Sequence, residues 1–358
     1  SGTFAMARDD LYKKGLKAYF KLCNCFRYNF PNFNTCFKTF DHTVLPILLY
    51  GCEIWGSFKP TLKRIVKAND KIETAYDKLE CERLNLKFCK RILGVSQHTT
   101  TNAVLGELGR YPIYISIVVQ IFKYWHYLEN KNESLVSDAY LLAKSLHSNK
   151  VESWSTWVDF LAKETDLSSY MSNPSAITSQ YLGSLVKSRL KAQFEEKWKK
   201  DLFNDEGRKG QQKNKLRTFR LFKYIFTREP YLDHIKDPDH RKALCRLRTS
   251  SHNLEIERGR HLGIHSHKRI CKNCSLQEVE DENHFLLTCD AHSQDRESFL
   301  KCLYAKYPNI KYLDNNAKFC WIMSAEDPDI CNNLAKFVFQ SFQRNLRANI
   351  AQVQNNID

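Results

Sequence analysis

The chain has 358 residues, of which 42% are apolar and 13% aromatic, enough for a sizeable core and about two domains. Its 55 Lys and Arg outnumber its 40 Asp and Glu, and the net charge of +15 favours polyanionic partners such as nucleic acid. The longest apolar stretch, Val44 to Trp55, is too short to span a bilayer and contains Glu53, which argues against a membrane-embedded protein. A basic protein without a nucleic-acid partner is the alternative.

Helices are predicted along most of the chain, because it contains only 12 Gly and 9 Pro and has long stretches of helical period. Taken in order, the predicted helices cover Phe4 to Cys25, Asp41 (as cap) to Tyr50, Lys63 to Leu93 before Gly94, Thr99–Thr101 (as caps) to Gly109, and Pro112 to Asn130. Further helices are predicted at 132–147, 151–164, 176–203, Asp237 (as cap) to Thr249, 291–306 and 328–348. We therefore expect a mostly α-helical, elongated array.

Three regions are expected: 1–130, 131–212 and 213–358. A polar, glycine-containing link from Asp205 to Gln212 is the predicted internal boundary. Thirteen cysteines, with no visible disulfide framework or signal peptide, indicate a reducing intracellular compartment, either nucleus or cytoplasm. The first residues, Ser1 to Ala5, enter a helical pattern without an initiator methionine, so we expect the chain to be part of a longer protein.

The strongest motif lies near the C-terminus and has the spacing Cys-x2-Cys-x9-His-x4-Cys. Its members are Cys271, Cys274, His284 and Cys289. Three thiolates and one imidazole form a complete ligand set for a closed, structural zinc site, so we predict a zinc-knuckle-like module at about 264–292 that contains one Zn²⁺. On an ideal α-helix His284 and Cys289 would lie roughly 140° apart, so Cys289 should follow the end of a short helix.

Two alternatives to this ligand set stay open. The cysteines can be buried without a metal, or nearby residues can replace His284 and Cys289. The candidate replacements are His265, His267 and His292 for the histidine, and Cys302 for the last cysteine.

Basic residues gather before and around the motif and are the predicted contacts to nucleic acid. They are Arg217, Arg220, Lys223, Arg241, Lys242, Arg246, Arg248, Arg258, Arg260, Lys268 and Arg269. Aromatic residues between Lys213 and Arg228 can stack on bases, or belong to the core: Phe219, Phe222, Tyr224 and Phe226. The loop of the motif is instead acidic (Glu278, Glu280, Asp281 and Glu282), so we infer that the zinc module braces the structure while the basic residues meet phosphates.

No catalytic residue is predicted. The pair Asp9-Asp10 has the composition of a two-metal polymerase site, but it falls in the first turns of a predicted helix, where acidic residues favour the helix dipole. A P-loop, a nucleophile elbow and a zinc-protease motif are also absent from the sequence.

Several blocks carry a resemblance to one family. They are Ser1 to Leu22, Val44 to Gly56 with its Tyr-Gly-Cys-Glu-Ile-Trp-Gly end, Phe88 to Val95, Gly106 to Pro112, and Leu216 to Cys289. Together these blocks resemble the part of non-LTR (LINE-type) retrotransposon reverse transcriptases that follows the polymerase palm. The gap of nine residues between Cys274 and His284 is longer than that of the retroviral knuckle, so that module's base recognition is not transferred.

This resemblance implies thumb and connector helices in 1–130, and a C-terminal zinc-knuckle region that handles template RNA or target DNA during target-primed reverse transcription. The palm, with its metal-binding aspartates, is expected upstream in the same polyprotein, so this chain should be inactive as a polymerase alone. The alternative is a domesticated or decayed transposon fragment that serves as a protein-interaction scaffold.

Overall fold

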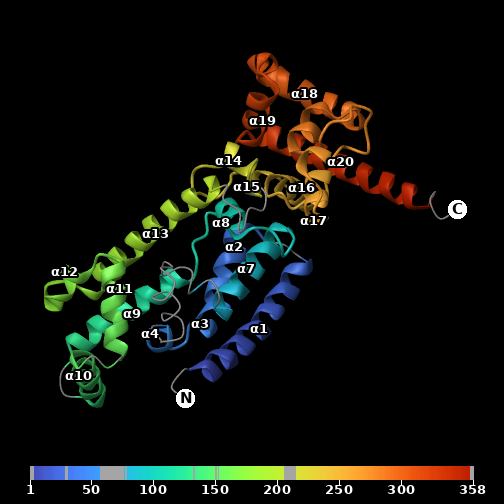
Figure 1. The fold of residues 1–358 in the computed structure, drawn as a ribbon. Coiled ribbons are helices and arrows are strands. Elements are labelled where there is room, and N and C mark those ends of the chain that lie inside the picture. The colour runs from blue at the N-terminus through green and yellow to red at the C-terminus, as the bar shows by residue number, and fades with distance from the viewer. Residues whose placement is uncertain are drawn as a thin grey trace. The chain divides into compact units, whose positions relative to one another are not determined.

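The computed structural model describes residues 4–28, 31–56, 76, 79–131, 134–149, 151, 153–204 and 215–354. This described part is mostly helical, as predicted, and its β-pairing consists of the isolated bridges Leu108–Arg228 and Ile270–Val279 (Figure 1). The chain divides into two compact units, each built from two separated stretches. The first combines Ser1–Phe88 with Tyr111–Trp198, and the second combines Cys89–Arg110 with Lys199–Asp358. The predicted link at 205–212 lies outside the described residues.

The first unit is built from helices. They are α1 (Ala5–Tyr28), α2 (Phe33–Thr43), α3 (Leu45–Leu48), α4 (Cys52–Trp55), α9 (Tyr114–Glu129), α10 (Leu135–Ser148), α11 (Trp154–Glu164) and α12 (Ser168–Met171), with η1 (Pro174–Ala176). Two further helices, α7 (Glu80–Leu93) and α13 (Ser179–Phe203), each begin in the first unit and end in the second.

The core of the first unit is centred on Phe88. Its ring stacks on Phe40 with the centroids 4.3 Å apart, and it meets Phe37 and Tyr19 edge-on. These contacts join α1, α2 and α7, because each aromatic side chain lies on the apolar stripe of its helix. Buried Glu82 accepts a hydrogen bond from Ile113 N at 2.7 Å and so satisfies an amide just before α9.

The Tyr-Gly-Cys-Glu-Ile-Trp-Gly block forms a tight turn around α4. Gly51 has a φ of 68°, a conformation that favours glycine. A side chain at Gly56 would meet Ile117 Cγ2 at 2.4 Å and Cys52 O at 2.5 Å. The indole of Trp55 donates to Tyr50 O at 2.8 Å. The spacing of this block therefore serves local packing.

The predicted helix from Asp41 to Tyr50 is wrong, because the structure has α2 up to Thr43 and a separate short α3 over Leu45–Leu48. Asp41 does not begin a helix; it lies inside α2, whose N-cap is Asn32, and the Asn32 side chain accepts from Thr35 N. The apolar stripe of α2 already starts at Phe33, so the earlier Asx residue is the cap. Of the predicted helix from Lys63 to Leu93, the part up to 78 lies outside the described residues except Tyr76, and the rest is helical to Leu93 before Gly94.

The second unit contains the last residues of α7, the whole of α8 (Thr101–Leu108), and the C-terminal helices. These are α14 (Phe219–Phe222), α15 (Tyr231–His234), α16 (Pro238–Arg248), α17 (Glu255–His261), α18 (Ser293–Lys306), α19 (Asn315–Met323) and α20 (Pro328–Gln354). Short helical turns lie at η3 (Ser266–Lys268), η4 (His284–Thr288), η5 (Asp290–His292) and η6 (Pro308–Tyr312). The predicted start of α16 is confirmed, because Asp237 caps it and Pro238 occupies its first turn.

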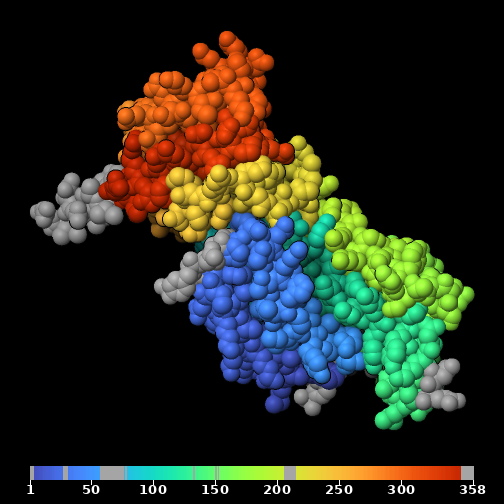
Figure 2. All heavy atoms as spheres, turned by 180° about the vertical axis from the view of Figure 1, so that it is seen from behind, coloured from blue at the N-terminus to red at the C-terminus, as the bar shows by residue number. Residues whose placement is uncertain are grey.

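Helices α15, α16 and α18 of the second unit pack against the long helix α20. Figure 2 shows α16, in gold, beside α20, in red, and the two helices are in extensive contact. On α20, Phe337 stacks on Phe299 of α18 with centroids 5.9 Å apart. The ring centroids of Phe285, from η4, and Phe342 are 5.1 Å apart, and Phe285 is fully buried. The segment that carries the motif histidine is therefore anchored in this core.

Candidate metal centre and basic surface

A short antiparallel bridge presents the first two cysteines. Cys271 N donates to Glu278 O at 2.8 Å, and Glu280 N donates to Arg269 O at 3.0 Å. These bonds flank the Ile270–Val279 bridge and turn the intervening Cys-x2-Cys loop back on itself. The turn brings Cys274 near Cys271.

A π-helical turn brings the other two ligands together. Asp281 Oδ1 accepts from His284 N at 2.8 Å at the start of this turn, and Cys289 N donates to His284 O at 2.9 Å at its end. Hydrogen bonds between residues five apart define a π-helix, so His284 and Cys289 come closer than on an α-helix. Cys289 follows the end of the helix, as predicted.

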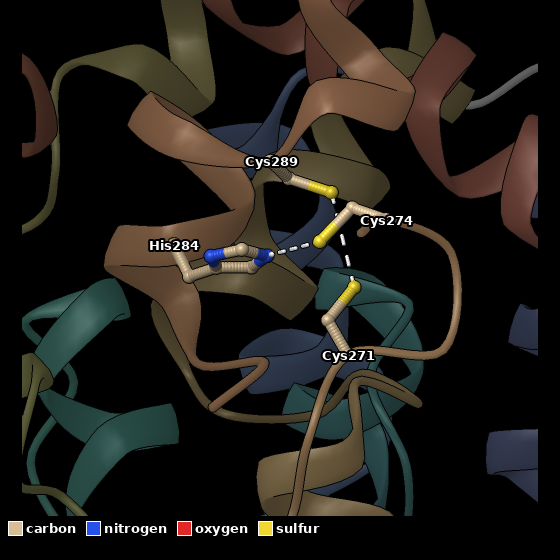
Figure 3. Close-up of side chains that lie close together, drawn as sticks. All are labelled: Cys271, Cys274, His284 and Cys289. Carbon is tan, nitrogen blue, oxygen red and sulfur yellow. Dashed lines mark hydrogen bonds between the residues drawn. The ribbon is translucent and has the colours of Figure 1, made fainter. Parts of the chain in front are cut away.

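The four residues converge as ligands of one ion would (Figure 3). Their nearest ligand atoms all lie within 4.8 Å of one another. The Cys271 and Cys289 sulfurs are 3.8 Å apart, and Cys274 Sγ is 3.5 Å from His284 Nε2. On a tetrahedral zinc with ordinary bond lengths, two sulfurs lie about 3.8 Å apart, and a sulfur and an imidazole nitrogen about 3.5 Å apart. This group can bind a metal ion, and its dimensions are compatible with zinc.

The far side of the imidazole is held in the way that metal-binding histidines usually are. His284 Nδ1 lies 2.9 Å from Glu278 Oε2 and 3.0 Å from Thr288 Oγ1. A carboxylate on Nδ1 fixes the tautomer in which Nε2 is free to bind a metal, and it makes that nitrogen more basic. Glu278 therefore supports the site without being a ligand.

The close approach of the cysteines and His284 shifts their pKa values. The hydrogen bond to Cys289, together with burial, raises the pKa of Cys271, whereas the same bond lowers the pKa of Cys289. Burial lowers the pKa of His284, but hydrogen bonds to Cys271 and Glu278 outweigh it and raise that pKa to about 9. Because metal binding requires thiolates and a neutral imidazole, protons compete with the ion here.

The acidic residues of the loop each have a partner inside the protein. Glu278 orients His284, and Asp281 caps the turn that carries it. Glu280 Oε2 accepts from Glu255 N at 2.8 Å, at the start of α17. Glu282 is fully buried and accepts from Arg217. The acidic loop is therefore tied by hydrogen bonds to other residues of the second unit.

Arg217 links the module to α17. Its Nη2 lies 2.9 Å from Glu282 Oε2, and its Nη1 lies 2.9 Å from Glu257 Oε1 on α17. His252 Nε2 and Ser250 Oγ complete the surroundings of Glu282, each 3.1 Å from its Oε1. Arg217 pairs with two buried carboxylates, and the pKa of Glu282 falls to about 2 because these partners outweigh the opposing effect of its burial.

The alternative ligands lie elsewhere within the described residues. The rings of His265 and His267 stack on each other and are exposed. His292 is buried against the ring of Phe285, with centroids 5.0 Å apart. Cys302 Sγ accepts from Asn333 on α20. The motif of the sequence, not these neighbours, forms the candidate centre.

The predicted basic residues fall into two groups. Four are occupied inside the protein: Arg217 as described, Arg248 with Glu107 and Glu229, Lys223 with Glu229 and Thr227 O, and Arg269 with Ile256 O and Ile264 O. Arg248, Lys223 and Arg269 are also buried. These four residues are therefore not available as surface contacts to nucleic acid. A sequence pattern of charge does not distinguish a solvated cation from one paired across the fold.

The other predicted cations are at least partly exposed. Arg246, Arg258 and Lys268 are exposed; Arg220, Arg241, Lys242 and Arg260 are intermediate. Several form local contacts: Arg241 with Ile235 O, Lys242 with Asp239, Arg260 with Glu257, and Arg220 over the Phe203 ring. Of the aromatics, Phe219, Phe222 and Phe226 belong to the core, whereas Tyr224 is 61% exposed.

Asp9 and Asp10 form exposed surface ion pairs with Lys13 and Lys14, one turn later on α1.

No helix within the described residues is long and apolar enough to cross a membrane. The chain matches no protein-family model, no curated protein and no solved structure.

Proposed function

We propose that Cys271, Cys274, His284 and Cys289 bind one structural Zn²⁺. The spacing, two ligand-atom separations that match a tetrahedral zinc, and the carboxylate behind His284 support this assignment. Four protein ligands fill a tetrahedral zinc, so no position is available for a substrate. The ion would stabilise a segment in which the chain reverses direction.

We further propose that the chain is a non-catalytic, nucleic-acid-binding part of a LINE-type reverse transcriptase that grips template RNA or target DNA. Three observations support this: the net charge of +15, the candidate zinc module, and exposed cations in the same unit as the module. The candidate metal centre is the observation on which the proposal chiefly depends. The family assignment itself rests on the sequence blocks described above.

The experiment combines metal analysis with binding at several salt concentrations. We expect one zinc per chain, its loss on chelation, and nucleic-acid affinity that falls steeply as salt is raised. Loss of zinc should weaken binding, because the module then unfolds. Absence of zinc from the purified protein, or undetectable binding at about 0.1 M salt, would contradict the proposal.

A protein-interaction scaffold of transposon origin is the second candidate, and α10 favours it. Leu135, Leu142 and Leu146 are 84%, 61% and 37% exposed, and their spacing places them on one face of this helix. The genomic sequence encoded immediately upstream separates the two candidates. An open frame with a palm and paired aspartates supports the first, whereas a stop or an unrelated promoter supports the second.

A further inference from the structure

A cleft of about 840 Å³ lies next to the candidate metal centre, entirely within the second unit. The loop after α7, the segment from α16 into α17, the Cys-x2-Cys turn and the C-terminal half of α20 form its walls. Pockets that bind small molecules have volumes of about 300 to 1,000 Å³, so the cleft has room for an unpaired nucleotide but not for a duplex. Sequence analysis did not identify it, because its walls come from four separate segments.

Three cations line this cleft: Arg246, Arg258 and Lys272. Arg258 and Lys272 are held by Glu255, with Arg258 Nε 2.8 Å and Lys272 Nζ 3.4 Å from its Oε1. About half of each of these two side chains is exposed, whereas that of Glu255 is 11% exposed. Glu255 therefore positions the two cations while its own charge is largely covered.

The two arginines are bound in the same manner. Arg246 Nε donates to Gly94 O at 2.7 Å, and Arg258 uses its Nε for Glu255. Among the described residues, no hydrogen bond is formed by the Nη groups of either arginine. A guanidinium fixed through Nε presents its outer edge in a defined direction, and this geometry suits a phosphate group.

Six further lining residues have the chemistry that a nucleobase requires. Side-chain amides of Asn253, Asn273, Gln343 and Asn345 offer both donors and acceptors, which can pair with the edges of an unpaired base. Phe342 and Leu346 lie one turn apart on α20 and present an apolar surface, and Leu346 is 54% exposed. An unstacked base can cover this surface, as bases do on apolar platforms of other proteins.

A second cleft, of about 410 Å³, extends the first one. The two share Ser96, Arg258 and the segment from Ser251 to Asn253, and the second adds Lys215. A path with cations at intervals fits a flexible polyanionic strand better than a free mononucleotide. An acidic peptide shares the charge of such a strand, but it lacks the base edges for which the amides are suited.

We propose that this cleft receives an unpaired nucleotide of single-stranded nucleic acid, with Arg246, Arg258 and Lys272 on its phosphates and α20 against its base. The inference rests on the proposed function and specifies where, and in which form, nucleic acid is bound. The metal centre acts indirectly: Lys272 and Asn273 belong to the Cys-x2-Cys turn, so the metal would hold one wall of the cleft in place.

The test uses the full, zinc-loaded chain and a fluorescent 12-nucleotide single strand, alone or annealed to its complement, with binding followed by anisotropy. We expect the wild type to prefer the single strand. The double variant Arg258→Ala/Lys272→Ala should lose about tenfold in affinity for the single strand, and the salt dependence of log K should fall by about 0.7 for each side chain removed.

A third substitution separates base contact from charge. Leu346→Ala should weaken single-strand binding by about fivefold and leave the salt dependence unchanged, because it removes only apolar contact. The matched control is Lys301→Ala/Lys336→Ala, which removes two exposed charges of the same unit outside the cleft. Its affinity should change less than twofold. Zinc content and circular dichroism are measured for every variant.

The cleft assignment is overturned if the cleft and control variants lose equal affinity, or if the wild type binds the duplex as tightly as the single strand. Displacement of the strand by polyglutamate at equal charge concentration would also overturn it, in favour of an acidic peptide. In each of these cases the proposed nucleic-acid function survives. A wild type that binds neither strand nor duplex instead refutes the proposed function.

Discussion

Arg248 donates to Glu107 at 3.0 Å, across 141 positions of sequence and inside the core of the second unit. The two side chains are 3% and 0% exposed. Glu229 is a second carboxylate on the same guanidinium, and the rings of Phe222 and Tyr231 cover its faces. Burial raises the pKa of Glu107, and Arg248 opposes this rise. The pair therefore joins α8 and α16, which come from separate stretches of the chain.

Removing Arg248 should destabilise the second unit strongly. Arg248→Ala leaves Glu107 buried without its cation, and breaking a buried pair from one side costs about 3–5 kcal/mol. Urea unfolding followed by circular dichroism measures the free energy of unfolding. Lys242→Ala, on the same helix but half-exposed and, within the described residues, paired only with Asp239, should cost less than about 1 kcal/mol. Equal losses for the two variants would show that burial of the pair is unimportant.

The metal centre should depend on both its ligands and their support. His284→Ala should abolish stoichiometric zinc, and Glu278→Gln should weaken zinc affinity by about 10- to 100-fold while the site still forms. Competition with a chromogenic chelator measures both effects. Zinc retained at one equivalent by His284→Ala would disprove the ligand assignment. His265→Ala and Cys302→Ser are the controls and should retain full zinc affinity.

Gly109 should not tolerate a side chain. Its φ is 56°, and an added Cβ would lie 2.5 Å from Arg228 N and 2.7 Å from Thr227 C, which are backbone atoms. Gly109→Ala should therefore cost well over about 1 kcal/mol in the free energy of unfolding. Gly263→Ala is the control, because Gly263 has a φ of 70° but nothing within 4 Å of the added carbon. Thermal unfolding should show a larger loss of stability for Gly109→Ala than for Gly263→Ala. The reverse order would contradict the close approach at Gly109.

The cap of α16 should make stability depend on pH. Backbone hydrogen bonds from His240 and Asp239 lower the pKa of Asp237 below its usual value of 3.8. A carboxylate with a depressed pKa stabilises the fold above its unfolded pKa, and this contribution disappears as pH falls through the folded value. Asp237→Ala should cost about 1 kcal/mol at pH 7 and less below pH 3.

Asp237→Asn tests the same cap without a titrating group. Asparagine caps helices as well as aspartate does, so this variant should match the wild type near pH 7 and lack the part of the pH dependence that comes from the cap. Denaturant unfolding at several pH values measures the difference. An Asp237→Ala cost that does not change with pH would exclude the carboxylate as its source.

Local chemistry explains which features could be predicted from sequence. Helices follow from the period of apolar residues and from caps such as Asp237 and Gly94, which act within one turn of the chain. The ligand set follows from spacing, because a Cys-x2-Cys turn and a nearby histidine and cysteine need no distant partner to meet. The cap at Asn32 was missed because Asp41 offered the same chemistry.

The sequence by itself determined the helical character, the candidate metal-binding motif and the basic charge, since each depends on residues close together in the chain. Only the tertiary structure decided which cations are available. Arg248 and Arg217 are paired across the fold, whereas Arg246, Arg258 and Lys272 line a cleft. The reason is that burial and pairing depend on segments brought together by packing. The sequence position of a basic residue does not indicate which carboxylate it will pair with in the folded protein.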